Sequence, residues 1–371
     1  MAAPAVTHTQ DLAPHSAKAS TRLATQQSVA DQPAAAHAET QHAQSRRTRR
    51  ALTWGLIGVI VLAAVSMFVG VTDVNLPALL AGDPAAWEIF WVSRLPRTAA
   101  VILAGMAVSV AGLIMQLMAR NKFVEPSMVG TVESATLGIL VATVAFPAAA
   151  LFTKMGVAAL FAILGTWLFL TVINRLPTRN TLLVPLVGIM LGGVISAVTT
   201  FFAYRFDLLQ TLNTWMIGDF SGVIRGRYEL LWIVAIVTAI GYFAADRFTV
   251  AGMGADFTTN LGLNYKAIMR LGMTIVALIS AIVVTTVGSL PFLGLVVPNL
   301  VSIFFGDNLR RAVPLTAITG AGLVLVCDIL SRTIRFPYEV PVGMIMSVVG
   351  AVLFLLLLLR TQRRQAAHPR A

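Results

Sequence analysis

The chain has 371 residues, of which 57% are hydrophobic and 12% are charged. A soluble domain carries about 25% charged residues, so this composition excludes an ordinary soluble fold. The formal charge of +11 does not indicate nucleic-acid binding, because no basic patch is interleaved with aromatic residues; basic loops that set membrane topology explain the charge better.

The first 50 residues are mostly Ala, Gln, His, Thr and Ser. Such a composition does not bury a core and predicts disorder. The first apolar run begins too late for a signal peptide. We therefore expect a disordered cytoplasmic tail at 1–50, a transmembrane domain at 51–362 and a cytoplasmic C-terminal tail at 363–371.

Apolar blocks of about 17–25 residues, the length that crosses a bilayer, follow one another along the chain. They predict an all-α polytopic membrane protein with about ten transmembrane helices. The predicted spans are 52–71, 95–118, 131–147, 156–173, 182–203, 229–245, 268–288, 292–305, 313–331 and 341–359. The eighth is short and contains Pro298, which indicates a partial or broken helix packed inside the protein.

The distribution of Lys and Arg predicts the orientation. With both termini in the cytoplasm, the cytoplasmic segments hold 19 of the 27 basic residues, as the positive-inside rule requires. Arg94, Arg97 and Arg332 then lie outside, against that trend. Arg94 and Arg97 are three residues apart at a predicted helix start, with Pro96 in the first turn. They serve either a partner or only the lipid phosphates, to which interfacial arginines extend.

The chain lacks the residues that ATP hydrolysis and transition-metal binding require. No G-x-x-x-x-G-K-[ST] phosphate loop occurs, so ATP is not hydrolysed here by that route. The five histidines all lie in the tails and Cys327 is the one cysteine, which disfavours a path for bare transition-metal ions. Met115 and Met118 share a helix face, either for copper(I) or as apolar filler. We therefore expect no catalytic residue, no metal site and no cofactor.

Asp328 is taken as the ionisable residue deepest in a predicted span. It lies four residues before Arg332, so both face one side of a helix in the favourable acid-before-base order. An ion pair is the preferred interpretation, and a proton relay is the alternative.

The longest predicted cytoplasmic connection covers 244–270. It contains glycines at 252, 254 and 262 and a helix-like stretch from Asp256 to Leu261. A long, partly structured loop in a tightly connected protein is often a contact surface.

Several stretches at matching spacing resemble one family. They are "RLPRTAAVILAGMAVSVAGLIMQ", "ARNKFVEPSMVGT", "TWMIGDFSG", "NLGLNYK", "GSLPFLGLVVPNLV" and "YEVPVGMIMSVVGAVLFLLLLLR". The chain is similar over about 50–360 to permease subunits of ABC importers for iron–siderophore, haem and cobalamin, and within them to catecholate (petrobactin-type) permeases. It departs from the usual pattern at Asn299 and Ser302, where relatives have His and Arg, and at Ala255, where relatives have an acid.

The resemblance implies a type II ABC importer permease fold in the bacterial cytoplasmic membrane, forming half of the pathway. The implied partners are a second permease, with a heterodimer favoured, two ATP-binding subunits that use ATP, an extracytoplasmic siderophore-binding protein and membrane lipid. Iron would travel as its siderophore chelate. The implied sites are docking arginines Arg94, Arg97 and Arg332, a coupling loop with Gly254, Asp256, Asn260, Leu261 and Gly262, and pathway residues Met190, Ser196, Thr199, Met344 and Ser347.

Two other classes remain open at this point. A secondary transporter driven by protons or ions would need intramembrane carboxylates or broken helices near the bilayer midplane, and Asp328 and the Pro298 span are the hints of one. A membrane anchor without transport activity is the second alternative. Within the resembling family, a haem or cobalamin permease is a further alternative.

Overall fold

A computed structural model describes residues 46–70, 76–173, 175, 183–226, 228–306 and 309–367. Its contacts divide the chain into Met1–Ala51 and Leu52–Ala371, and the second unit is the body described below. The predicted disordered tail falls largely on residues 1–45, which lie outside the described residues. The predicted C-terminal boundary at 362 lies inside a helix that continues to Ala367.

The described body is all-helical, which confirms the predicted fold class. A helix at Arg46–Phe68 comes first. The later elements are α2 (Leu76–Leu80), α3 (Pro84–Ile89), the π-helical turn η1 (Phe90–Arg94), α4 (Leu95–Met118), the 3₁₀ turn η2 (Pro126–Val129), α5 (Thr131–Ala145), α6 (Leu151–Ile173), α7 (Leu183–Arg205), α8 (Leu209–Met216), α9 (Leu230–Phe243), α10 (Ala245–Met253), α11 (Ala255–Asn260), α12 (Tyr265–Val287), α13 (Leu293–Phe305), α14 (Leu309–Thr333) and α15 (Val342–Ala367).

The ten predicted spans all correspond to apolar helices, but fewer are long enough to cross a bilayer. Among the described residues, seven helices qualify by length and composition, and an eighth does if α9 and α10 count as one span bent by 57°. The remaining two, α5 and α13, are shorter. The short α13, with Pro298 inside it and most of its first half buried, confirms the interpretation of the eighth predicted span.

Helix α4 forms the centre of the body. The most apolar 18-residue stretch of the helical run Pro84–Met118, to which α4 belongs, is 78% buried. Helix α4 packs against α9, α12, α13 and α14. Small residues allow this close packing, as is common between membrane helices. A Cβ on Gly105 would lie 2.8 Å from the carbonyl oxygen of Gly320 in α14, and one on Gly112 would lie 2.0 Å from that of Gly294 in α13. These two contacts hold α4 at backbone distance from two neighbours.

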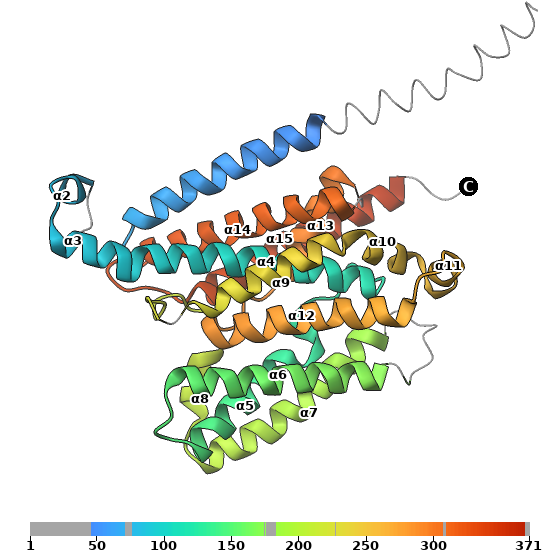
Figure 1. The fold of residues 1–371 in the computed structure, drawn as a ribbon, viewed down its shortest axis with the longest axis horizontal. Coiled ribbons are helices and arrows are strands. Elements are labelled where there is room, and N and C mark those ends of the chain that lie inside the picture. Colours follow the sequence, from blue (N-terminus) through green and yellow to red (C-terminus); the bar gives the residue numbers. More distant parts are fainter. Residues whose placement is uncertain are drawn as a thin grey trace, which may run out of the picture. The chain divides into compact units, whose positions relative to one another are not determined.

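The two ends of α4 carry different structures. Figure 1 shows α2 and α3 at the end where α4 begins, and α10 and α11 at the end where it finishes. We call these the arginine end and the α11 end. The 24 residues of α4 rise by about 36 Å, which is more than the ~30 Å of a hydrocarbon core.

Candidate functional sites at the two ends of the body

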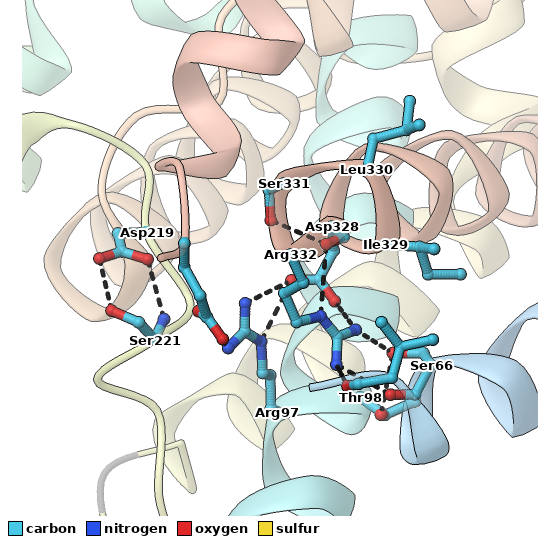
Figure 2. Close-up of polar contacts among 12 residues, drawn as sticks. Ser66, Arg97, Thr98, Asp219, Ser221, Asp328, Ile329, Leu330, Ser331 and Arg332 are labelled. Atoms are coloured by element: carbon cyan, nitrogen blue, oxygen red, sulfur yellow. Dashed lines mark hydrogen bonds and ion pairs between the residues drawn. The ribbon is translucent and has the colours of Figure 1, made fainter. Parts of the chain in front are cut away.

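A buried ion-pair network lies at the arginine end, where α4 begins and α14 ends (Figure 2). One oxygen of Asp328 accepts hydrogen bonds from Arg97 Nε at 3.1 Å and Nη2 at 2.9 Å, and the other accepts from Arg332. Glu339 accepts a bond from Arg97 Nη1 at 2.7 Å. The side chain of Asp328 is fully buried, and those of Arg97 and Arg332 are 8% and 1% exposed. Leaving one such buried charge unpaired costs about 3–5 kcal/mol, so the pairing is what allows these groups inside the body.

Arg332 of this network and the nearby Arg94 also bind the end of the helix Arg46–Phe68. Arg332 Nη1 donates to the carbonyl oxygens of Ser66 and Val69 at 2.8 and 2.7 Å, and its Nη2 donates to Ser66 Oγ at 2.6 Å. Arg94 Nη1 donates to the Val69 carbonyl at 2.8 Å. The last carbonyls of a helix have no partner within the helix and carry partial negative charge. Two guanidinium groups therefore satisfy this helix end.

The α-helix α4 begins at Leu95 with Pro96 in its first turn, as predicted. The helical run does not stop there, because it extends upstream through the π-helical turn to Pro84. Pro96 has no N–H to donate four residues back, and the carbonyl of Val92 accepts instead from the backbone N–H of Arg225 at 2.9 Å. The wider turn and this outside donor let the proline lie inside a continuous helix.

The structure brings the three predicted docking arginines together, as expected, and buries them. Arg94, Arg97 and Arg332 are 6%, 6% and 2% exposed, whereas the prediction places them at an open rim. Sequence spacing correctly identified the Asp328–Arg332 ion pair, and it missed Glu339. Contact of this network with another protein stays a prediction.

The predicted coupling residues lie at the α11 end. Helix α11 confirms the predicted helix-like stretch, and it is flanked by Gly254 and Gly262 with φ of +131° and +74°. Only glycine adopts such backbone angles without steric cost. Asp256, Asn260 and Leu261 are exposed, the last by 56%. The expected loop at 244–270 also contains α10, which the sequence interpretation had not resolved as a helix.

One buried threonine holds α11 against α10. Thr258 is fully buried, and its Oγ1 lies within hydrogen-bonding distance of the carbonyl oxygens of Gly254, at 2.6 Å, and Val250, at 3.1 Å. The residue before Thr258, Phe257, is 48% exposed and lies four residues before Leu261. The α11 end thus displays two large apolar side chains from an anchored short helix.

The predicted pathway residues differ in exposure. Met190 and Ser196 on α7 and Met344 on α15 are exposed, and Ser347 is half-buried. Thr199 is buried, at 4% exposure, with Oγ1 donating to the Ile195 carbonyl at 2.7 Å. Thr199 is therefore not open to a pathway in the single chain.

Two carboxylates inside the body were missed by the sequence interpretation, the buried Glu125 and the half-buried Glu133. Glu125, at 5% exposure, accepts bonds from Ser127 Oγ at 2.7 Å and from the Phe292 backbone at 3.3 Å. Glu133, in the first turn of α5, lies against Gly192 of α7, and its Oε2 is buried without a hydrogen-bond partner among the described residues. Asp328 is therefore one of several carboxylates inside the body, and Glu133 was visible as an acid within the third predicted span.

Comparisons with known proteins identify the family. The FecCD transport family matches residues 57–360. The petrobactin import permease YclN of Bacillus subtilis is 46% identical over 83% of this chain and 98% of that protein. The petrobactin import permease FatD of Bacillus anthracis is 44% identical over 83% and 90%.

A solved structure of an inward-facing ABC transporter of the metal-chelate type has the same fold. It superposes with a TM-score of 0.75 at 22% identity, over 84% of this chain and 99% of that one. The helical body thus has the fold of that ABC transporter. The chain belongs to the FecCD transport family and is the permease subunit of an ABC importer, whose ATPase activity lies in a partner subunit.

Proposed function

We propose that this chain carries ferric siderophores of the catecholate type across the bacterial cytoplasmic membrane, as half of the pathway of an ATP-driven importer. The observation that carries the proposal is the 44–46% identity to two petrobactin permeases over nearly their whole lengths. The residues between 51 and 364 contain no histidine, which suits iron that stays inside its chelator.

The proposed orientation has the arginine end outside and the α11 end in the cytoplasm, with both termini cytoplasmic. Most basic residues of the chain then lie in cytoplasmic segments, as the positive-inside rule requires. The arginine network would be the docking site of the extracytoplasmic binding protein. The α11 end, with exposed Phe257 and Leu261, would fit an apolar cleft of the ATPase.

The second permease would pack along α7 and α15. Both helices keep large apolar side chains exposed in the single chain, including Met190 and Val194 on α7 and Met344 and Val348 on α15. Lipid covers part of such a surface in any membrane protein. The exposed Ser196 on α7 adds a polar group that favours a water-filled pathway over lipid. A heterodimer is favoured by the resemblance to catecholate importers.

Uptake of radiolabelled substrates by a strain lacking this gene tests the proposal. The cells are given iron-labelled ferric catecholate, ferric hydroxamate or haem, or cobalt-labelled cobalamin, with and without the gene restored on a plasmid. The proposal expects the deletion to abolish uptake of a ferric catecholate and the plasmid to restore it. Normal catecholate uptake together with loss of cobalamin or haem uptake would assign the chain to another branch of its family.

A further inference from the structure

Arg97 lies between two carboxylates that differ in burial and in the element that carries them. Asp328 is on helix α14, is fully buried and takes Nε and Nη2. Glu339 lies between α14 and α15, outside either helix, and takes Nη1. Its side chain is 24% exposed. Glu339 is therefore the one of these two carboxylates that solvent and other proteins can reach.

The segment that carries Glu339 is lightly anchored and rich in exposed apolar groups. Ile334, Phe336 and Tyr338 are 61%, 65% and 69% exposed. Val340 donates to the Ser331 carbonyl at 3.0 Å, and this backbone bond ties the far end of the segment to α14. Connecting segments with few backbone bonds open more readily than helices. Large aromatic side chains are also enriched at protein interfaces.

We propose that Glu339 occupies, in the free chain, the position that an acidic side chain of a docking protein takes on Arg97. The inference rests on the docking function proposed for this end of the body. On docking, the partner's carboxylate binds Nη1, the Glu339 carboxylate turns to water, and Asp328 stays in place. Asp328 keeps Nε and Nη2, and one carboxylate replaces another at Nη1, so every donor of the buried guanidinium that is bonded in the free chain stays bonded.

This exchange makes Glu339 a competitor of the partner for Arg97. Its substitution should therefore change the docking affinity in the opposite direction to the substitution of an ordinary contact residue. Removing its charge should tighten docking, whereas removing a contact weakens docking. The partner must present an acid that reaches past Phe336 and Tyr338, both of which can pack against it. The surface thus fits an acidic protein knob flanked by apolar residues.

The test uses the assembled importer in lipid nanodiscs and the extracytoplasmic binding protein of the same transport system. Glu339→Gln keeps the size of the side chain and removes its charge. We expect the affinity for the binding protein to rise about two- to fivefold, which is the factor that corresponds to the free energy of a partly exposed ion pair. Glu339→Asp, with a shorter reach to Nη1, should give a smaller rise.

Glu88→Gln is the matched control. Glu88 is exposed, precedes Arg94 in the same helical run, and loses the same charge. A general electrostatic effect on an acidic partner would change both variants alike. The exchange expects a rise with Glu339→Gln alone, and equal changes in the two variants would overturn it.

Arg97→Gln separates this inference from the docking function beneath it. If Arg97→Gln leaves the affinity unchanged in a properly assembled importer, the docking function itself is wrong. If it weakens docking while Glu339→Gln does not strengthen it, the exchange alone is wrong. The exchange further expects Glu339→Gln to have no effect in the Arg97→Gln background. A rise in affinity that appears only in nanodiscs with anionic lipid would mean that the effect of Glu339→Gln depends on lipid, and it would overturn the proposal.

Discussion

Replacing Asp328 with Asn is the sharpest test of the buried network. The carboxylate accepts three bonds from two guanidinium groups. Asn at this position removes the negative charge that both buried guanidinium groups face. Removing one partner of a buried ion pair costs about 3–5 kcal/mol. The amide nitrogen would also face a guanidinium that needs an acceptor.

The assay is reversible unfolding of the purified chain in mixed micelles, followed by circular dichroism. Asp246→Asn is the matched control, because Asp246 pairs with Arg310 at 3.7 Å with both side chains largely exposed. Such a pair contributes at most about 1 kcal/mol. We expect Asp328→Asn to lower the free energy of unfolding by at least ~2 kcal/mol more than Asp246→Asn. Equal losses would refute the reasoning that burial makes this network essential.

Two further substitutions test the packing of α4 and the α11 end. Gly112→Ala places a methyl group 2.0 Å from the Gly294 carbonyl and should lower the free energy of unfolding by about 1–3 kcal/mol, whereas Gly193→Ala, with nothing within 4 Å of its Cβ, should be neutral or stabilising. A neutral Gly112→Ala would contradict the close backbone approach. Leu261→Asp should reduce co-purification of the partner ATPase by about tenfold with normal membrane insertion, and Leu80→Asp, at the other end, should not. Unchanged co-purification by Leu261→Asp would remove α11 from the ATPase contact.

The fold was predictable where apolar length and local spacing decide it. Ten apolar helices occur where the hydropathy pattern places them, and Pro298 correctly indicated a short internal one. The i,i+4 spacing gave the Asp328–Arg332 pair because a helix brings such residues together without any tertiary information.

What failed depends on contacts between distant parts of the chain. Arg97 and Asp328 are separated by 231 positions, and no spacing rule joins them. The continuation of the helical run upstream of Pro96 was not predicted, because the Val92 carbonyl is bound by the backbone N–H of Arg225, which is a tertiary contact. The depth of Glu125 was likewise invisible, because it depends on the segment between α4 and α5 packing against the backbone at Phe292.

The central claim is ATP-driven import of a ferric catecholate through this permease. It is tested most directly in vesicles that carry the permease pair in the membrane and the ATPase on the inside. The binding protein, with the radio-iron siderophore bound to it, is added on the outside. We expect uptake that persists with a proton uncoupler and stops when the phosphate-loop lysine of the ATPase is replaced. Uptake that survives the ATPase substitution and collapses with the uncoupler would contradict the account.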